Sequence, residues 1–232
     1  MDLSNRDEYE QRLARALSRV YGRHRREIVE LLGDPPDPVR LDVEFWNRSS
    51  EELQAVVRPI LEKVALESAE QLARESVIGV DWGLVNQSAA DWASRYTFDQ
   101  VSGITRTSQR AIQRAISRYF AQGQTIGELY DSLSRIFGPV RAEMIAVTEI
   151  TRAAARGEVL IADDIARRGV VMVRVWQTNR DELVCPICGP LQGQQAENGI
   201  FTHPDGSTYT EPPAHVRCRC WLNHALPEPV NG

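Results

Sequence analysis

Long apolar runs and an excess of positive charge are missing from this sequence of 232 residues, and lysine is almost absent. No window approaches the roughly 18 uninterrupted apolar residues of a membrane helix, and acids stand near the start, where a secretory signal carries basic residues. We therefore expect neither export nor a membrane span. The formal net charge of -5 argues against a protein whose whole surface binds nucleic acid. Lysine occurs once, at Lys63, beside 26 arginines, which suit two-pronged contacts to carboxylates and phosphates.

Cysteine is absent from the first 184 residues and then appears four times. The four form two close pairs, Cys185 with Cys188 and Cys218 with Cys220. In a chain without an export signal, this pattern favours metal ligation over disulfide bonds.

The first part of the chain has helical periodicity. Apolar residues recur every three or four positions from residue 6 to residue 32, which predicts a long amphipathic helix that ends at Gly33. The DPPDP segment that follows predicts a stiff break. Ser49 and Glu52 have the spacing of a capping box, so we expect the next helix to begin there, with Pro59 as a kink or as the true start.

Aromatic residues gather between positions 79 and 98, at Trp82, Trp92, Tyr96 and Phe98. Such a group can stack nucleic-acid bases, but helical spacing without interleaved cations favours ordinary core packing.

A helix predicted from about Ser108 to Phe120 carries arginines along one face. No acid interrupts this arginine stripe, which we define as Arg106, Arg110, Arg114 and Arg118. The stripe suits DNA phosphates or an acidic protein, and the alternative is a solvated helix face.

Capping and periodicity place two further helices before the sequence changes character. Thr125 and Glu128 form a second capping box, and a long helix is expected from Pro139 to about Arg168. In that helix we interpret Glu149 and Glu158 as caps or members of surface ion pairs. The β-branched stretch 170–176 then predicts a strand, and Asp205 with Gly206 predicts a hairpin turn.

These patterns predict an α+β protein: a mainly helical body followed by a small, loop-rich C-terminal module that carries a Cys/His cluster. We expect an N-terminal amphipathic helix or arm over 1–34, a helical region over 35–138 and the C-terminal module over 139–232.

Five candidate metal ligands lie in the C-terminal module. Two cysteines two residues apart present both sulfurs to one ion, and a second group from a distant segment completes a tetrahedron. Our first choice is Cys185, Cys188, His215 and Cys218, with Cys220 as substitute for either of the last two, so that a four-cysteine site stays open. Zinc suits thiolate and imidazole ligands, and four protein ligands would make it structural. The alternatives are buried free thiols or disulfides.

Most enzymatic motifs are missing. The sequence has no H-E-x-x-H, no P-loop, and no H-x-E upstream of its C-x-x-C. A Cys185–His215 nucleophile pair and a His-Asn-His nuclease built from His203, His215, Asn223 and His224 are weaker alternatives. We predict that the protein is not an enzyme.

The C-terminal sequence resembles the phage Mu F-like head morphogenesis, or minor capsid, family. The resemblance covers about residues 139–222 and lies in the order TE, W-x-T-x-x-D, C-x-x-C, L-x-G, PP-x-H and C-R-C. The family pattern falls on Thr148, Glu149, Trp176, Thr178, Asp181, Cys185, Cys188, Leu191, Gly193, Pro212, Pro213, His215, Cys218 and Cys220.

This resemblance implies a structural protein inside a phage head at the portal vertex, present in the host cytoplasm during assembly. Its implied partners are the portal or capsid protein and double-stranded DNA, with no membrane and no small-molecule substrate. A metal-dependent nuclease and a zinc-bearing nucleic-acid-binding protein are the alternative functions.

Overall fold

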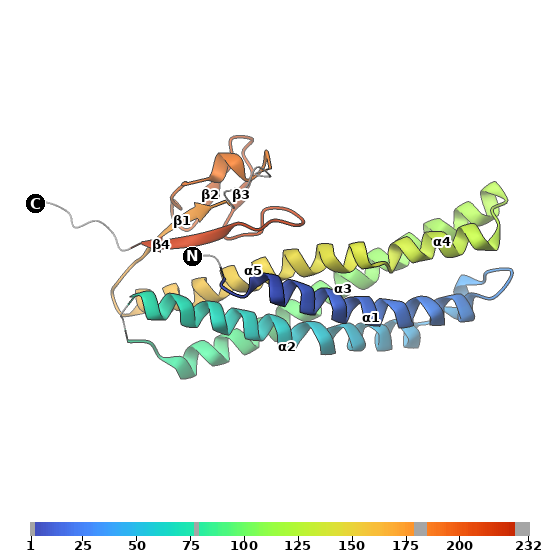
Figure 1. Ribbon diagram of the computed structural model, residues 1–232, viewed down its shortest axis with the longest axis horizontal. Helices are drawn as coiled ribbons and strands as arrows, with labels where there is room; N and C mark the ends of the chain where they lie inside the picture. The colour runs from blue at the N-terminus through green and yellow to red at the C-terminus, as the bar shows by residue number, and fades with distance from the viewer. Residues whose placement is uncertain (1–2, 77–78, 179–184, 226–232) are drawn as a thin grey trace, which may run out of the picture. The chain divides into compact units, whose positions relative to one another are not determined.

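The structure is a computed structural model that describes residues 3–76, 79–178 and 185–225. Its described residues form a mainly helical α+β protein (Figure 1). The Cys/His cluster lies near the C-terminus, as the sequence predicts. The helices are α1 (Arg6–Leu32), α2 (Val43–Ser76), α3 (Trp82–Gln122), α4 (Ile126–Ile136) and α5 (Pro139–Arg167), with short 3-10 helices at Pro38–Arg40 and Gly189–Leu191. The strands are β1 (Val173–Gln177), β2 (Phe201–Thr202), β3 (Thr208–Tyr209) and β4 (Trp221–Ala225).

Helix α1 has the bounds that its periodicity predicts. Its buried stripe includes Leu13, Leu17 and Ile28, and its arginines at positions 12, 15 and 19 are exposed. Gly33 follows with φ 69°, a left-handed conformation that glycine adopts without steric cost.

The predicted start of α2 is wrong. The helix begins at Val43, and the carboxylate of Asp42 accepts a hydrogen bond from the backbone N–H of Phe45 at 2.8 Å. Ser49 lies inside the helix and is buried, so its spacing to Glu52 is not a cap here. Pro59 also lies inside α2 rather than at its start.

Two predictions for α3 are corrected. The helix is continuous from Trp82 to Gln122, so the segment expected to begin near Ser108 is its second half. The aromatic residues do not fill the core, because Phe98 is 60% exposed and Trp82 39% exposed. Smaller side chains occupy the buried stripe instead, at Val85, Ala89, Ala93, Thr97 and Val101.

The chain forms two compact units, each discontinuous in sequence. Unit 1 comprises residues 1–10, 61–93 and 145–232, and unit 2 comprises residues 11–60 and 94–144. The predicted division into 1–34, 35–138 and 139–232 stays a prediction. None of the described helices combines the length and apolar character that crossing a lipid bilayer requires.

Unit 2 is a helical body built from parts of α1, α2, α3 and α5 together with α4. Tyr21 and Phe137 pack edge to face with ring centroids 5.7 Å apart. Helix α4 begins at the predicted capping box, in which Thr125 and Glu128 each bond to the other's backbone N–H. Arg141 ties α5 to α3 by hydrogen bonds to the Ser108 hydroxyl and the Ile104 carbonyl.

Unit 1 holds the C-terminal module against α5. Strands β1 and β4 pair antiparallel, with Trp176 opposite Leu222, and β2 pairs with β3 across the predicted turn at Asp205 and Gly206. Trp176 is fully buried and meets Phe201 at a centroid distance of 5.2 Å. This small core also contains Cys188, Cys218 and Cys220, with Cys185 partly buried against it, so three of the five candidate ligands belong to the packed interior of the module.

Candidate metal centre

The first arm of the centre is a tight turn at C-P-I-C. The backbone N–H groups of Cys188 and Gly189 donate to the carbonyl of Cys185 at 3.1 and 2.9 Å. The N–H of Cys188 also lies 3.3 Å from the Cys185 sulfur, to which it donates. The turn therefore fixes the positions of the Cys185 and Cys188 side chains relative to each other.

The second arm brings His215 to this turn. His215 Nε2 lies 2.9 Å from Cys185 Sγ and 3.2 Å from Cys188 Sγ. On the other side of the ring, Nδ1 is 2.7 Å from the carbonyl oxygen of Val216. Because a carbonyl only accepts, Nδ1 carries the proton and donates it, which leaves the Nε2 lone pair facing the sulfurs.

Cys218 and Cys220 complete a second group around Cys188. The Cys188 and Cys218 sulfurs are 3.7 Å apart, close to the about 3.8 Å expected between two thiolates bound to one tetrahedral zinc. The ligand atoms form two overlapping triads, each within 4.8 Å: Cys185, Cys188 and His215 in one, Cys188, Cys218 and Cys220 in the other. All five sequence-predicted residues are therefore brought together, and Cys188 is common to both triads.

The sulfur cluster accommodates one negative charge more easily than two. Hydrogen bonds from Cys188 and Cys220 lower the pKa of Cys218, which makes Cys218 the favoured thiolate. The hydrogen bond to Cys218 and burial raise the pKa of Cys188 well above its ordinary value. A divalent cation supplies the positive charge that further deprotonation needs, so this donor set fits a soft divalent metal such as zinc.

A second layer of hydrogen bonds fixes the Cys218 arm to α5. The Thr151 hydroxyl donates to the Cys218 carbonyl at 2.7 Å, and the buried Arg6 guanidinium donates to the Thr151 oxygen at 2.7 Å. One turn earlier, Thr148 Oγ1 accepts the backbone N–H of Arg217 at 2.9 Å. Arg217 has φ 63°, so this bond holds the left-handed turn between His215 and Cys218.

The other residues of the motif build the scaffold around the cluster. Thr178 directs its backbone N–H and its hydroxyl to Gln192 Oε1, at 2.7 and 2.6 Å. Leu191 is fully buried, and Gly193 takes φ 73° where its N–H donates to the Trp176 carbonyl. Asp181 lies outside the described residues.

Glu149 and Glu158 of α5, predicted to be caps or members of surface ion pairs, do not lie at the surface. Glu149 is only 2% exposed and Glu158 only 4% exposed, although Glu149 does lie 3.7 Å from Arg152. Both are buried because segments far away in the sequence cover α5, which helical periodicity does not reveal.

The histidines of the nuclease alternative are not assembled into one group. His203 pairs with Asp205 at 2.8 Å in the β2–β3 turn, and His224 stands opposite Arg174 in the β1–β4 ladder. Burial, together with the charge of Arg174, lowers the pKa of His224 to about 3. Among the described residues, His215 is the histidine that shares a cluster with potential ligands.

The arginine stripe belongs to unit 2, whereas the metal cluster belongs to unit 1. All four stripe side chains are exposed, and Arg114 donates through Nε to the Arg110 carbonyl at 3.2 Å. The stripe is therefore available as a surface, and its predicted partner stays a prediction.

Sequence reasoning missed the supporting residues. Arg6 and Glu10 in α1 act at the module, since Glu10 forms an ion pair with Arg219. Thr151 had a weak signal, because it follows Thr148 by three residues and so shares its side of the helix. Comparison with known proteins adds nothing to this picture: no protein-family profile, curated protein or solved structure matches the chain.

Proposed function

We propose that this protein is a structural, non-enzymatic component of a phage head, with a C-terminal module held together by one zinc ion. The observation that carries the metal part is that the Cys188 sulfur belongs to both ligand triads, with His215 Nε2 at 3.2 Å on one side and the Cys218 sulfur at 3.7 Å on the other. Four protein ligands fill a tetrahedral zinc, which leaves no position for an activated water. A module with four short strands and long loops gains cohesion from such an ion.

The phage assignment rests on the sequence resemblance. The structure supports treating its scattered elements as one unit, because TE, W-x-T, C-x-x-C, L-x-G and the final C-R-C meet in one small core or its hydrogen bonds. Motif residues that are far apart in the sequence are expected to occur together when one folded module depends on all of them. The proposed location is the interior of the head at the portal vertex, and the proposed partners are the portal or capsid protein.

Charge distribution supports a role for unit 2 in contacting DNA or an acidic protein. Its ranges contain 16 arginines against 12 acidic residues, whereas those of unit 1 contain 11 basic and 20 acidic residues. The net acidity of the chain therefore resides in unit 1, and the arginine stripe lies in the positively charged unit. Phosphates and carboxylates are the groups that exposed arginines bind best.

One pair of measurements tests this proposal. Metal analysis of the purified full chain should give one zinc per chain, and duplex DNA incubated with it in Mg²⁺ or Mn²⁺ should remain intact. If the protein cleaves DNA strands and the Cys185→Ser variant does not, the structural function is rejected in favour of the nuclease alternative. Mass spectrometry of particles assembled from the genome that carries this gene should also detect the protein, and its absence from them would reject the phage assignment.

A further inference from the structure

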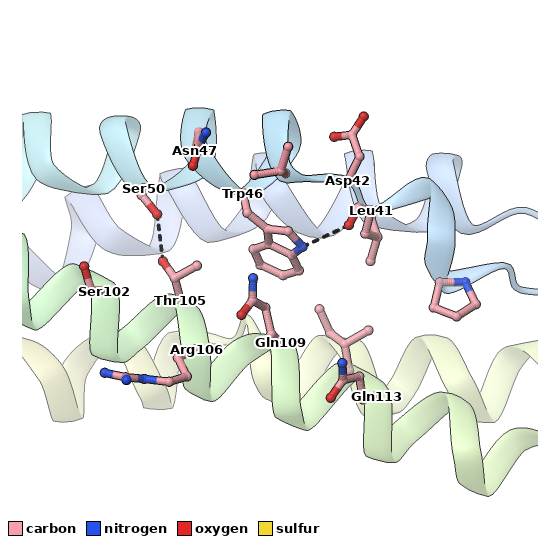
Figure 2. A pocket seen from close by; sticks show the side chains of 13 residues that line it. Leu41, Asp42, Trp46, Asn47, Ser50, Ser102, Thr105, Arg106, Gln109 and Gln113 are labelled. Carbon is pink, nitrogen blue, oxygen red and sulfur yellow. Dashed lines mark hydrogen bonds between the residues drawn. The ribbon is translucent and has the colours of Figure 1, made fainter.

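A groove of about 680 Å³ runs between the start of α2 and the middle of α3, entirely within unit 2 (Figure 2). Trp46 of α2 and Gln109 of α3 face each other across it, and a 3.0 Å hydrogen bond between Ser50 and Thr105 marks one end. The buried side chain of Ile112 contributes to its apolar lining. Trp46 is held in place, because its indole N–H donates to the Leu41 carbonyl at 3.1 Å.

The lining combines apolar surface with groups that match a polypeptide backbone. Asn47, Gln109 and Gln113 supply amides, each of which offers both donors and an acceptor, as a peptide bond does. Trp46, Leu41 and Ile112 provide apolar contacts of the kind that receive an aliphatic or aromatic side chain. These groups match the alternating polar and apolar surface of an extended polypeptide.

The charged residues around the groove indicate which kind of polypeptide segment binds there. The α3 side of the groove has no carboxylate, since α3 carries no acid between Gln100 and Gln122. Arg106 lines the groove on this side and begins the arginine stripe. The carboxylate on the α2 side, Asp42, is engaged by the Phe45 N–H. An acidic side chain of the bound segment therefore meets its complement at Arg106.

We infer that this groove binds an extended, acidic segment of a partner protein, with a carboxylate at Arg106 and an apolar side chain between Trp46 and Ile112. The inference concerns unit 2 and is independent of the metal centre. In this groove the side-chain amides would bond the peptide backbone and the apolar lining would receive one side chain.

A selection from random dodecapeptides displayed on a solid support, with the full-length protein as bait, tests the inference. The recovered peptides should be enriched in Asp and Glu beside an apolar residue, with a measurable Kd. Arg106→Glu should weaken their binding about tenfold, the value of one well-placed charge pair, and should select Lys or Arg peptides instead. Arg118→Glu, three helical turns away on the same stripe, is the matched control and should change the Kd less than twofold.

Three outcomes would overturn the inference. One is a selection in which the unsubstituted protein enriches acidic peptides no more than the Trp46→Ala variant does. Another is an equal loss in Arg106→Glu and Arg118→Glu, which would mean diffuse electrostatic attraction. The third is a 20-base-pair duplex that binds and competes with the peptides, which would assign the surface to nucleic acid. Zinc content measured on every variant separates failure of this groove from failure of the metal centre.

Discussion

Thr151 of α5 donates its hydroxyl to the carbonyl of Cys218 and accepts a hydrogen bond from Arg6, both at 2.7 Å. This single hydroxyl joins the N-terminal segment, the long helix and one candidate ligand. Its position means that the candidate metal centre depends on groups that do not touch the metal.

Thr151→Val should weaken both the fold and metal retention. The substitution keeps the shape but removes the hydroxyl that links the buried Arg6 to the Cys218 carbonyl, at a cost of about 2 kcal/mol. Loss of this second layer should lower zinc affinity about 10-fold or more. Urea denaturation and competition with a zinc chelator measure the two effects. Thr107→Val, at an exposed α3 threonine whose hydroxyl bonds only within its helix, is the control and should change neither.

Cys185→Ser should remove the metal and loosen the C-terminal module while unit 2 stays folded. Limited proteolysis should then cut within residues 185–225, and helical circular dichroism should fall little. Ile187→Ser, in the same turn at an exposed non-ligand, should behave as the unsubstituted protein. Unchanged protease resistance of Cys185→Ser would argue against a metal clip.

The choice between Cys218 and Cys220 can be settled with cobalt. The Cys188–Cys218 distance of 3.7 Å favours Cys218 as the fourth ligand. Cys220→Ser should therefore keep the sulfur-to-cobalt charge-transfer band at full intensity, and Cys218→Ser should weaken it. The reverse result would select Cys220, and weakening in both variants would indicate a mixed site.

Gly157→Ala should be strongly destabilising. A Cβ at this position would lie 2.0 Å from the carbonyl oxygen of Ala65, so α2 and α5 must move apart at a cost of about 3 kcal/mol. Gly103→Ala is a matched control, since Gly103 is also inside a helix but has nothing within 4 Å of its added Cβ. That variant should gain about 0.5 to 1 kcal/mol from helix propensity. Equal destabilisation of both variants would contradict the close helix contact.

Glu211 should make the protein less stable as the pH rises. Burial raises its pKa above 4.5, although nearby arginines partly offset this effect. The folded state therefore holds this proton more tightly than the unfolded state, and stability is lost as pH rises from about 4.5 through the raised folded value. The charged groups around Glu211 are Arg152, Arg156, Arg174 and Asp163.

The measurement for Glu211 is the urea midpoint as a function of pH in Glu211→Gln and in the unsubstituted protein. The variant should lack this part of the decline, so the two curves should diverge as pH rises above about 4.5. Glu197→Gln, at an exposed position of the same module, should follow the unsubstituted curve. Parallel curves for all three proteins would show that ionisation of Glu211 does not lower the stability of the folded state.

Reversal of Arg110 and Arg114 to glutamate should reduce binding to DNA or to an acidic partner, and should make the remaining binding less sensitive to salt. Arg12→Glu with Arg58→Glu is the control, because both arginines are exposed outside the stripe. Binding of the stripe variant at low salt with the affinity of the unsubstituted protein would discard this role.

Local patterns predicted what depends on local chemistry. The bounds of α1, the α4 capping box, the end of α5 and the β2–β3 turn follow from periodicity, caps and glycine, and the structure confirms them. The ligand cluster was also predictable, because cysteine spacing reflects the geometry of a turn. Contacts between distant segments were not predictable: the burial of Glu149 depends on what covers α5, and the outward aromatics of α3 reflect a core stripe made of valine, alanine and threonine.

The discontinuity of unit 1 bears on how the protein is made. A ribosome completes every residue of unit 2 at position 144, but the candidate ligands emerge only from position 185 onward. Capture of the proposed metal is therefore among the last steps of maturation. The first residues of α1, the later half of α2 and the start of α3 wait for the module that carries the ligands. A truncated messenger would yield a chain with a finished helical body and with stretches 1–10 and 61–93 left uncovered, a form that quality-control proteases recognise.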